Sequence, residues 1–168
     1  MKLNQNGFSL IELAVVIVIL GIVGLSSFVY IGFFKSVKLD GTADKLASDL
    51  QYVQSVAMST ATWYGVSFEA SPANKYYVYT TTGTVDVLIM DPAKFGSNLV
   101  VDTLQQFDTS ISSVSISGGN KIEFSPLGQP FSDKLGLPLS AEAIITLSSG
   151  NYSKTVRITP NTGRVRVQ

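Results

Sequence analysis

The sequence of 168 residues contains no cysteine and no histidine. The absence of cysteine excludes disulfide bonds and thiol chemistry. The absence of histidine removes the commonest general base of enzymes and the commonest metal ligand. Twelve basic and twelve acidic side chains give a formal net charge of zero, so the overall charge does not indicate a nucleic-acid partner. The composition therefore argues against an enzyme.

Other patterns typical of catalysis or metal binding are weak. The segment Gly118-Gly119-Asn120 predicts a hairpin turn rather than a phosphate-binding loop. Asp86, Asp91 and Asp102 are too far apart in the sequence to indicate a metal site. The sequence thus predicts no catalytic residue, no metal ligand and no cofactor.

One long apolar segment dominates the N-terminal part of the chain. Residues 8–34 contain a single charged side chain, Glu12. As a helix with a rise of about 1.5 Å per residue, this segment is roughly 40 Å long, enough to cross a hydrocarbon core of about 30 Å. It is too long for the apolar part of a cleaved secretory signal, and no small-residue cleavage site follows it. We therefore expect a retained transmembrane helix over residues 8–34, preceded by a short polar segment, residues 1–7.

The carboxylate of Glu12 needs an explanation, because a charge inside an apolar helix costs about 2–3 kcal/mol unless it finds a partner. One interpretation is that Glu12 lies near the membrane surface and is hydrated. The other is that it pairs with a positive group of a neighbouring subunit. The residue types alone leave both interpretations open.

The segment Gly7-Phe8-Ser9-Leu10-Ile11-Glu12-Leu13 resembles the N-terminal signal of type IV prepilins and type II secretion pseudopilins. In that family a membrane-bound prepilin peptidase cleaves after the glycine and methylates the new N-terminus. The resemblance implies that residues 1–7 are a leader peptide, that cleavage falls between Gly7 and Phe8, and that Phe8 is N-methylated. It also implies that Glu12 neutralises the N-terminal amine of an adjacent subunit during assembly.

Residues 35–61 predict an amphipathic helix that continues the anchor and ends near Thr60. Its apolar positions recur at spacings of three and four residues and form one narrow seam. The seam consists of Leu39, Ala43, Leu46, Leu50, Val53 and Ala57. We expect it to pack on the chain's own globular domain rather than in a free coiled coil, because it spans fewer than three heptads.

From Thr62 onward the apolar pattern has a period of two, which predicts short strands separated by glycine, proline, asparagine and serine. The expected strands are Trp63–Phe68, Tyr76–Tyr79, Val85–Ile89, Ile111–Ile116, Lys121–Phe124, Ala143–Leu147 and Thr155–Ile158. The longest loops are expected at Asp91–Asn98 and Gly128–Pro138. The sequence thus predicts an α+β fold, in which one long N-terminal helix packs on an antiparallel β-sandwich formed by residues 62–168.

Two distal segments, Phe124–Gly128 and Ile158–Val165, are similar to the two signatures of the GspH/FimT family of minor pseudopilins and minor pilins. The resemblance implies a pilin-like minor subunit of a type II secretion pseudopilus, which helps to nucleate or cap the periplasmic filament that drives protein secretion. The implied partners are the prepilin peptidase, other pseudopilins or pilins, and the inner-membrane assembly platform. The implied location is the bacterial inner membrane, with one span, the globular domain in the periplasm, and later incorporation into an envelope-spanning filament.

The C-terminal residues 154–168 contain basic side chains and no acidic ones. The basic residues are Lys154, Arg157, Arg164 and Arg166. Such a patch can follow a phosphate backbone, which suits the alternative function of a FimT-like minor pilin that binds DNA for uptake. The opposing interpretation is a solvated strand face balanced by carboxylates such as Glu123 or Glu142.

The segment Pro160–Gly163 predicts a four-residue turn that closes a hairpin. This turn places Ile158 opposite Val165 and Arg157 opposite Arg166. Because like charges that lie directly opposite are destabilising, the hairpin predicts that an anionic group offsets the two arginines. That group is a carboxylate of this chain, a carboxylate of a neighbouring subunit, or a phosphate.

Overall fold

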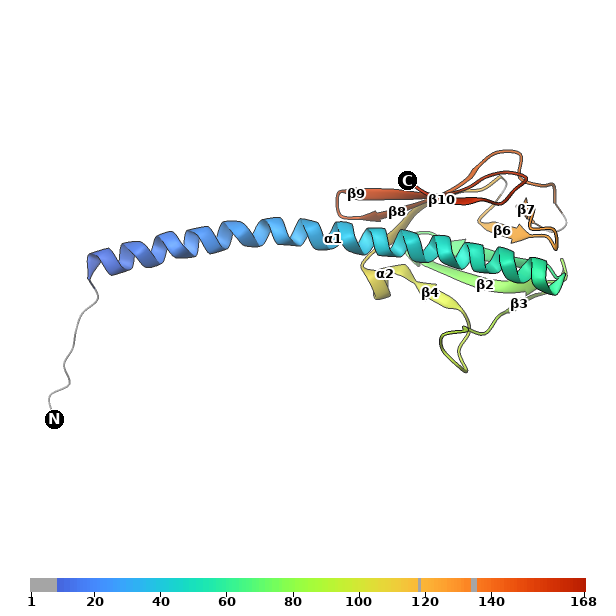
Figure 1. Cartoon of the computed structure of the whole chain (residues 1–168), viewed down its shortest axis with the longest axis horizontal. Coiled ribbons are helices and arrows are strands. Elements are labelled where there is room, and N and C mark those ends of the chain that lie inside the picture. The colour runs from blue at the N-terminus through green and yellow to red at the C-terminus, as the bar shows by residue number, and fades with distance from the viewer. Residues whose placement is uncertain (1–8, 118, 134–135) are drawn as a thin grey trace. The chain divides into compact units, whose positions relative to one another are not determined.

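The computed structural model describes residues 9–117, 119–133 and 136–168, with their side chains except those of residues 25–33. The longest element is α1, Leu10–Thr60, a single helix of 51 residues (Figure 1). The chain divides into two units, Met1–Phe34 and Lys35–Gln168. Helix α1 contributes to both units, and the division falls where the apolar segment gives way to the amphipathic one.

The second part of α1 belongs to the hydrophobic core of the globular unit. The six residues of the predicted seam, Leu39 to Ala57, are at most 2% exposed. In Figure 1 this part of the helix runs with one set of strands on either side of it. The helix ends at Thr60, because Ala61 adopts a left-handed conformation and the amide of Thr62 bonds back to the carbonyl of Ala57 at 3.2 Å. The prediction that the seam packs on the chain's own domain is confirmed.

The first sheet contains six antiparallel strands: β1 (Tyr64–Glu69), β2 (Lys75–Thr81), β3 (Asp86–Leu88), β4 (Val100–Asp102), β6 (Lys121–Phe124) and β7 (Pro130–Phe131). Their order is β3-β2-β1-β6-β7, and β4 pairs with the part of β2 that β3 leaves open. Strands β3 and β4 therefore share one edge of this sheet, and the segment between them projects from that edge (Figure 1).

The second sheet contains four antiparallel strands: β5 (Ser110–Ser115), β8 (Ala143–Ser149), β9 (Tyr152–Ile158) and β10 (Val165–Val167), in the order β10-β9-β8-β5. Burial alternates along β8, as expected for a strand with one face on a core. Residues of both sheets, such as Phe68, Phe124 and Ile145, join the helical seam in one cluster of buried side chains. The predicted α+β fold, with a long helix packed on antiparallel sheets, is confirmed.

Four local features differ from the prediction, the first being strand β4, which the sequence did not predict. The predicted turn at residues 118–120, of which residue 118 lies outside the described residues, does not join two strands of one sheet, because β5 and β6 lie in different sheets. Gly119 still forms a local antiparallel bridge with Ile116, and its amide donates to the Ile116 carbonyl at 3.1 Å. Strand β7 lies inside the segment 128–138, which we expected to be a loop. The short helix α2 (Thr103–Phe107) was not predicted; Asp102 caps it by accepting a hydrogen bond from the amide of Gln105 at 2.8 Å.

Candidate assembly segment and anionic-partner surface

The start of α1 contains a local partner for Glu12 that the sequence analysis missed. The Oγ atom of Ser9 accepts a hydrogen bond from the amide of Ile11, and Oε2 of Glu12 accepts one from the amide of Ser9, both at 3.3 Å. This reciprocal arrangement is a capping box, and its sequence signal is the spacing of Ser9 and Glu12. Glu12 therefore satisfies a helix-terminal amide of its own chain. The predicted cleavage and methylation residues, Gly7 and Phe8, lie outside the described residues.

The apolar segment that follows Glu12 exposes large hydrophobic side chains within its own unit, from Leu10 at 87% to Val16 at 44%. The described part of the chain contains no helix that is both long and apolar enough to cross a membrane. Residue 8 and the side chains of residues 25–33 are outside the described set. The transmembrane helix over residues 8–34 stays a prediction.

The C-terminal hairpin has the predicted register. Val165 pairs with Ile158, and Arg166 lies directly opposite Arg157. The turn closes because the amide of Thr159 donates to the carbonyl of Arg164 at 2.9 Å. The turn length and the alternation of apolar residues were sufficient to predict this pairing.

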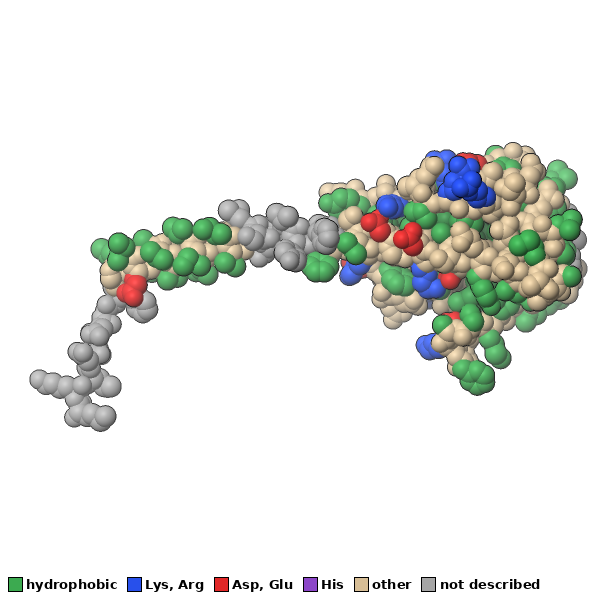
Figure 2. Space-filling model, viewed as in Figure 1, with side chains coloured by type: hydrophobic (Ala, Val, Ile, Leu, Met, Phe, Trp, Pro, Cys, Tyr) green, Lys and Arg blue, Asp and Glu red, His purple; other side chains and the backbone are tan. Residues whose placement is uncertain are grey.

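The four basic residues of the hairpin differ in how far their charges are neutralised. Arg157 pairs with Glu142 at 3.1 Å. Lys154 lies 2.7 Å from Oδ1 of Asp40, close enough for an ion pair although not aligned as a hydrogen bond. Within the described residues Arg164 and Arg166 make no ion pair, and both are exposed. Figure 2 shows basic side chains gathered over the β9–β10 edge.

The prediction that Glu123 balances this basic patch is not supported, because its side chain lies in the interior. Glu123 is 2% exposed and accepts a hydrogen bond from the hydroxyl of Tyr79 at 2.8 Å. Burial is the main cause that raises the pKa of Tyr79, and the hydrogen bond and charge of Glu123 raise it further. Of the two carboxylates considered from the sequence, only Glu142 offsets an arginine of the hairpin.

One residue that the sequence analysis did not single out, Gln54, joins the two distal signature segments. Its Nε2 atom donates to the carbonyl oxygen of Gly128 at 2.8 Å and to that of Thr162 at 2.9 Å. Both carbonyls belong to tight turns: the amide of Gly128 donates to Ser125, and that of Gly163 donates to Thr159. A single helical side chain thus holds the two turns against α1.

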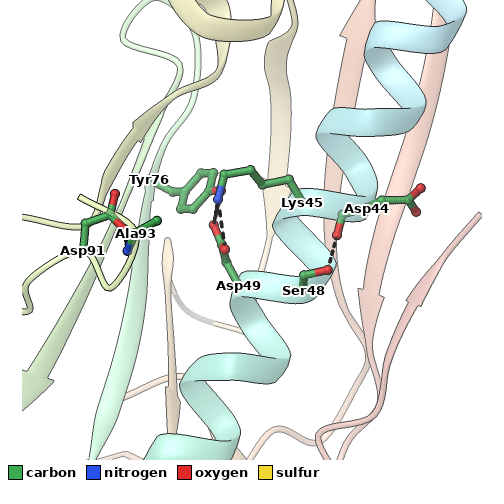
Figure 3. Close-up of polar contacts among 7 residues, drawn as sticks. All are labelled: Asp44, Lys45, Ser48, Asp49, Tyr76, Asp91 and Ala93. Atoms are coloured by element: carbon green, nitrogen blue, oxygen red, sulfur yellow. Dashed lines mark hydrogen bonds and ion pairs between the residues drawn. The ribbon is translucent and has the colours of Figure 1, made fainter.

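A polar network lies on another face of α1 (Figure 3). Lys45 donates to the carboxylate of Asp49 at 2.9 and 3.1 Å, and the hydroxyl of Tyr76 donates to Asp49 at 2.6 Å. Burial and the charge of Asp49 raise the pKa of Tyr76. A groove of about 550 Å³ between this face and the segment after β3 is lined by Lys45, Asp91 and other polar residues.

Neither this groove nor the rest of the described chain gathers three or more side chains suited to bind a metal ion. The three aspartates that we considered have separate local partners. Asp86 pairs with Lys121, Asp91 accepts from the amide of Ala93, and Asp102 caps α2.

Residues 2–28 match the prokaryotic N-terminal methylation motif. This motif precedes the second part of a long helix that packs in one core with two antiparallel sheets, which is the arrangement of a pilin-like fold. Pilins and pseudopilins, the proteins in which this motif and fold occur together, are structural and not enzymatic.

The fold is similar to those of two solved minor subunits. The type IV minor pilin FimU of Pseudomonas aeruginosa is 15% identical, with a TM-score of 0.51 over 81% of this chain and 90% of that one. The minor pseudopilin EpsH of the type 2 secretion system of Vibrio cholerae is 8% identical, with a TM-score of 0.54 over 78% of this chain and 96% of that one. At these identities the likeness shows the fold alone. A comparison with curated protein sequences gives no match.

Proposed function

We propose that this chain is a minor pseudopilin of a type II secretion pseudopilus, which helps to nucleate or cap the periplasmic filament. The observation that carries the proposal is the continuity of α1, which begins at the methylation motif and ends inside the core of the globular unit. In this proposal residues 8–34 anchor the chain in the inner membrane, and residues 62–168 lie in the periplasm. The partners are the prepilin peptidase, other pseudopilins or pilins, and the inner-membrane assembly platform.

Processing by the peptidase is the first test. Gly7 lies between a polar segment and the apolar helix. A side chain at this position should not fit a peptidase site that accepts glycine, so Gly7→Leu should retain residues 1–7. Mass spectrometry of the protein from cells should find the leader attached in the variant and an N-methylated Phe8 in the wild type. Normal mature protein from Gly7→Leu would contradict the assignment of the motif.

Glu12 provides the test of assembly, because two roles are now open to it. Glutamine can replace glutamate in a capping box but carries no charge. If Glu12 neutralises the amine of an adjacent subunit, Glu12→Gln and Glu12→Val should both stay in the membrane and fail to enter filaments. If Glu12 acts only as a cap, Glu12→Gln should assemble like the wild type. Unchanged co-purification of Glu12→Val with other pseudopilins would overturn the proposed role.

A second function, DNA binding by a FimT-like minor pilin, is favoured by one observation: Arg164 and Arg166 are exposed without a carboxylate partner in the described chain. Arg164→Gln or Arg166→Gln should weaken DNA binding similarly for all sequences and reduce the salt slope by about 0.9 for each phosphate that the protein no longer neutralises. Lys154→Gln is the matched control, since Asp40 already neutralises Lys154. If binding is absent or unaffected in all three variants, only the structural role remains.

A further inference from the structure

The edge of the first sheet at β3 is apolar and open. Five exposed large hydrophobic side chains fall within residues 85–95: Val85 57%, Val87 55%, Leu88 40%, Met90 68% and Phe95 102% exposed. Figure 2 shows hydrophobic side chains gathered on this side of the globular unit, near the projecting segment between β3 and β4. Monomeric proteins rarely gather exposed apolar side chains in this way without a binding role.

The backbone of β3 is available for pairing on its outer side. The amide of Thr82 donates to the carbonyl of Val85, and the amide of Ile89 donates to that of Val78. The carbonyl of Val85, both backbone groups of Val87 and the amide of Ile89 therefore face β2. Successive residues of an antiparallel strand direct their amide and carbonyl groups to alternate sides, so those of Asp86 and Leu88 point away from β2. In the described chain no strand lies beyond β3. Such an edge is a template for a strand of another chain.

The usual protection of an open edge by charge is missing here. The one charged residue of β3, Asp86, pairs with Lys121 on β6 at 2.6 Å, so its side chain reaches back over its own sheet. Burial acts to raise the pKa of Asp86, but the hydrogen bonds from Lys121 and Thr81 and the charge of Lys121 together outweigh it and lower the pKa. In the segment after β3, the negative charge of Asp91 and the positive charge of Lys94 sum to zero. The edge therefore carries no net charge, in contrast to the β10 edge with its two exposed arginines.

The segment that carries Phe95 is held in shape before any partner arrives. The amide of Asp91 donates to the carbonyl of Ser97 at 2.8 Å, the amide of Leu99 donates to that of Ile89 at 2.8 Å, and the side chain of Asp91 accepts from the amide of Ala93 at 2.8 Å (Figure 3). A loop closed in this way loses little conformational freedom on binding, which favours affinity. It presents one fully exposed aromatic ring, that of Phe95, in the segment that follows the open strand.

We propose that β3 and the loop with Phe95 form a docking site for an uncharged edge strand of a neighbouring pilin-like subunit. The strand would pair with the outward backbone groups of Asp86 and Leu88, and its apolar side chains would cover Val87 and Phe95. We infer an uncharged strand because the edge has no net charge that would attract a charged strand. The proposal rests on the proposed function, since it takes the neighbour to be a subunit of the same filament.

The test uses the full chain, whose lack of cysteine makes an introduced cysteine unique. A cysteine-reactive photo-crosslinker is attached to Met90→Cys, beside β3, or to Leu127→Cys, at an exposed position of the distal signature turn. Both are activated in membranes of cells that express the filament. We expect Met90→Cys to yield an adduct whose second chain, identified by mass spectrometry, carries the N-terminal methylation motif. Because the contact is not ionic, added salt should leave the yield unchanged.

A matched pair of variants isolates the backbone contact. Leu88→Pro and Leu88→Ala both remove the leucine side chain, but only proline also removes the backbone amide that points outwards. Proline is tolerated at this position because β3 is an edge strand. Leu88→Pro should lower the adduct yield about tenfold, equivalent to the loss of one hydrogen bond, and Leu88→Ala less than about threefold. If Leu88→Pro unfolds, Leu88→Lys should block strand addition with the backbone intact.

The outcomes separate this proposal from the proposed function. Equal yields from folded Leu88→Pro and Leu88→Ala, an unchanged yield from Leu88→Lys, a dimer of this chain alone, or an adduct without the motif would overturn the docking site. If Leu127→Cys captures motif-bearing chains and Met90→Cys does not, the chain assembles through other surfaces and only the docking site is wrong. If neither position captures such a chain, the proposed function fails, and the docking site fails with it.

Discussion

Gly163 lies so close to Gly128 that a Cβ atom at position 163 would stand 2.9 Å from the carbonyl oxygen of Gly128. The two glycines belong to the two distal signature turns, which are far apart in the sequence. Gln54 of α1 donates to the Gly128 carbonyl and to that of Thr162, the residue before Gly163. The turns and the helix therefore meet at one point, where there is no room for an additional methyl group.

Gly163→Ala should lower the free energy of unfolding by about 3 kcal/mol, because it combines a left-handed backbone with a steric clash. Gly163 has φ +65°, and the neighbour at 2.9 Å is backbone. The control is Gly96→Ala, with φ +80° and nothing within 4 Å of the added atom; it should cost only about 1–2 kcal/mol. Urea unfolding of the chain without residues 1–36 measures both. Equal losses would show that the contact with Gly128 is unimportant.

Gln54→Ala should cost about 1–3 kcal/mol, because two carbonyl groups lose their donor. Gln54→Glu should cost more, since a carboxylate cannot donate to either carbonyl and would repel both. Gln51→Ala, on an exposed position of the same helix, is the control and should change stability by less than about 0.5 kcal/mol. The same unfolding measurement applies. A loss for Gln54→Ala no larger than that for Gln51→Ala would refute the role of Gln54.

Stability should fall in alkaline solution because of Tyr76 and Tyr79. Burial, helped by Asp49 and Glu123, raises the pKa of both hydroxyls above the usual value of about 10. Above that pH the unfolded chain releases these protons and the folded chain keeps them. The contribution is therefore complete below about pH 10 and is lost at higher pH, by about 1.4 kcal/mol per pH unit for each tyrosine. Urea midpoints between pH 8 and 11 test this, and Tyr79→Phe should reduce the slope. A stability that does not fall above pH 10 contradicts it.

Removal of the apolar segment should leave a folded domain, whereas removal of the seam should not. A truncated chain that begins at Val37 keeps Leu39 to Ala57 in the core, and we expect a soluble, folded monomer. A chain that begins at Thr62 exposes the sheet surfaces that the seam covers and should aggregate. Size-exclusion chromatography and near-ultraviolet circular dichroism distinguish these states. A stable monomer that begins at Thr62 would show that α1 is dispensable for the core.

The sequence by itself determined the features that depend on local periodicity. The spacing of Leu39 to Ala57 identified the buried face of α1, because a helix repeats every 3.6 residues whatever it packs against. Alternating apolar residues located most of the strands, and the length of the Pro160–Gly163 turn set the pairing of Arg157 with Arg166. The motif at Gly7–Leu13 indicated the class of protein before the fold did.

The tertiary structure alone decided which distant groups meet. It placed β5 and β6 in different sheets, which the short segment between them does not reveal. In the folded chain Glu123 lies in the core and accepts a hydrogen bond from Tyr79, and Glu142 pairs with Arg157. Gln54 donates hydrogen bonds to the carbonyls of two turns. Local patterns record which face of an element is apolar. The partner of a polar side chain depends on where the packing of the whole core brings the elements together, and that arrangement has no period in the sequence.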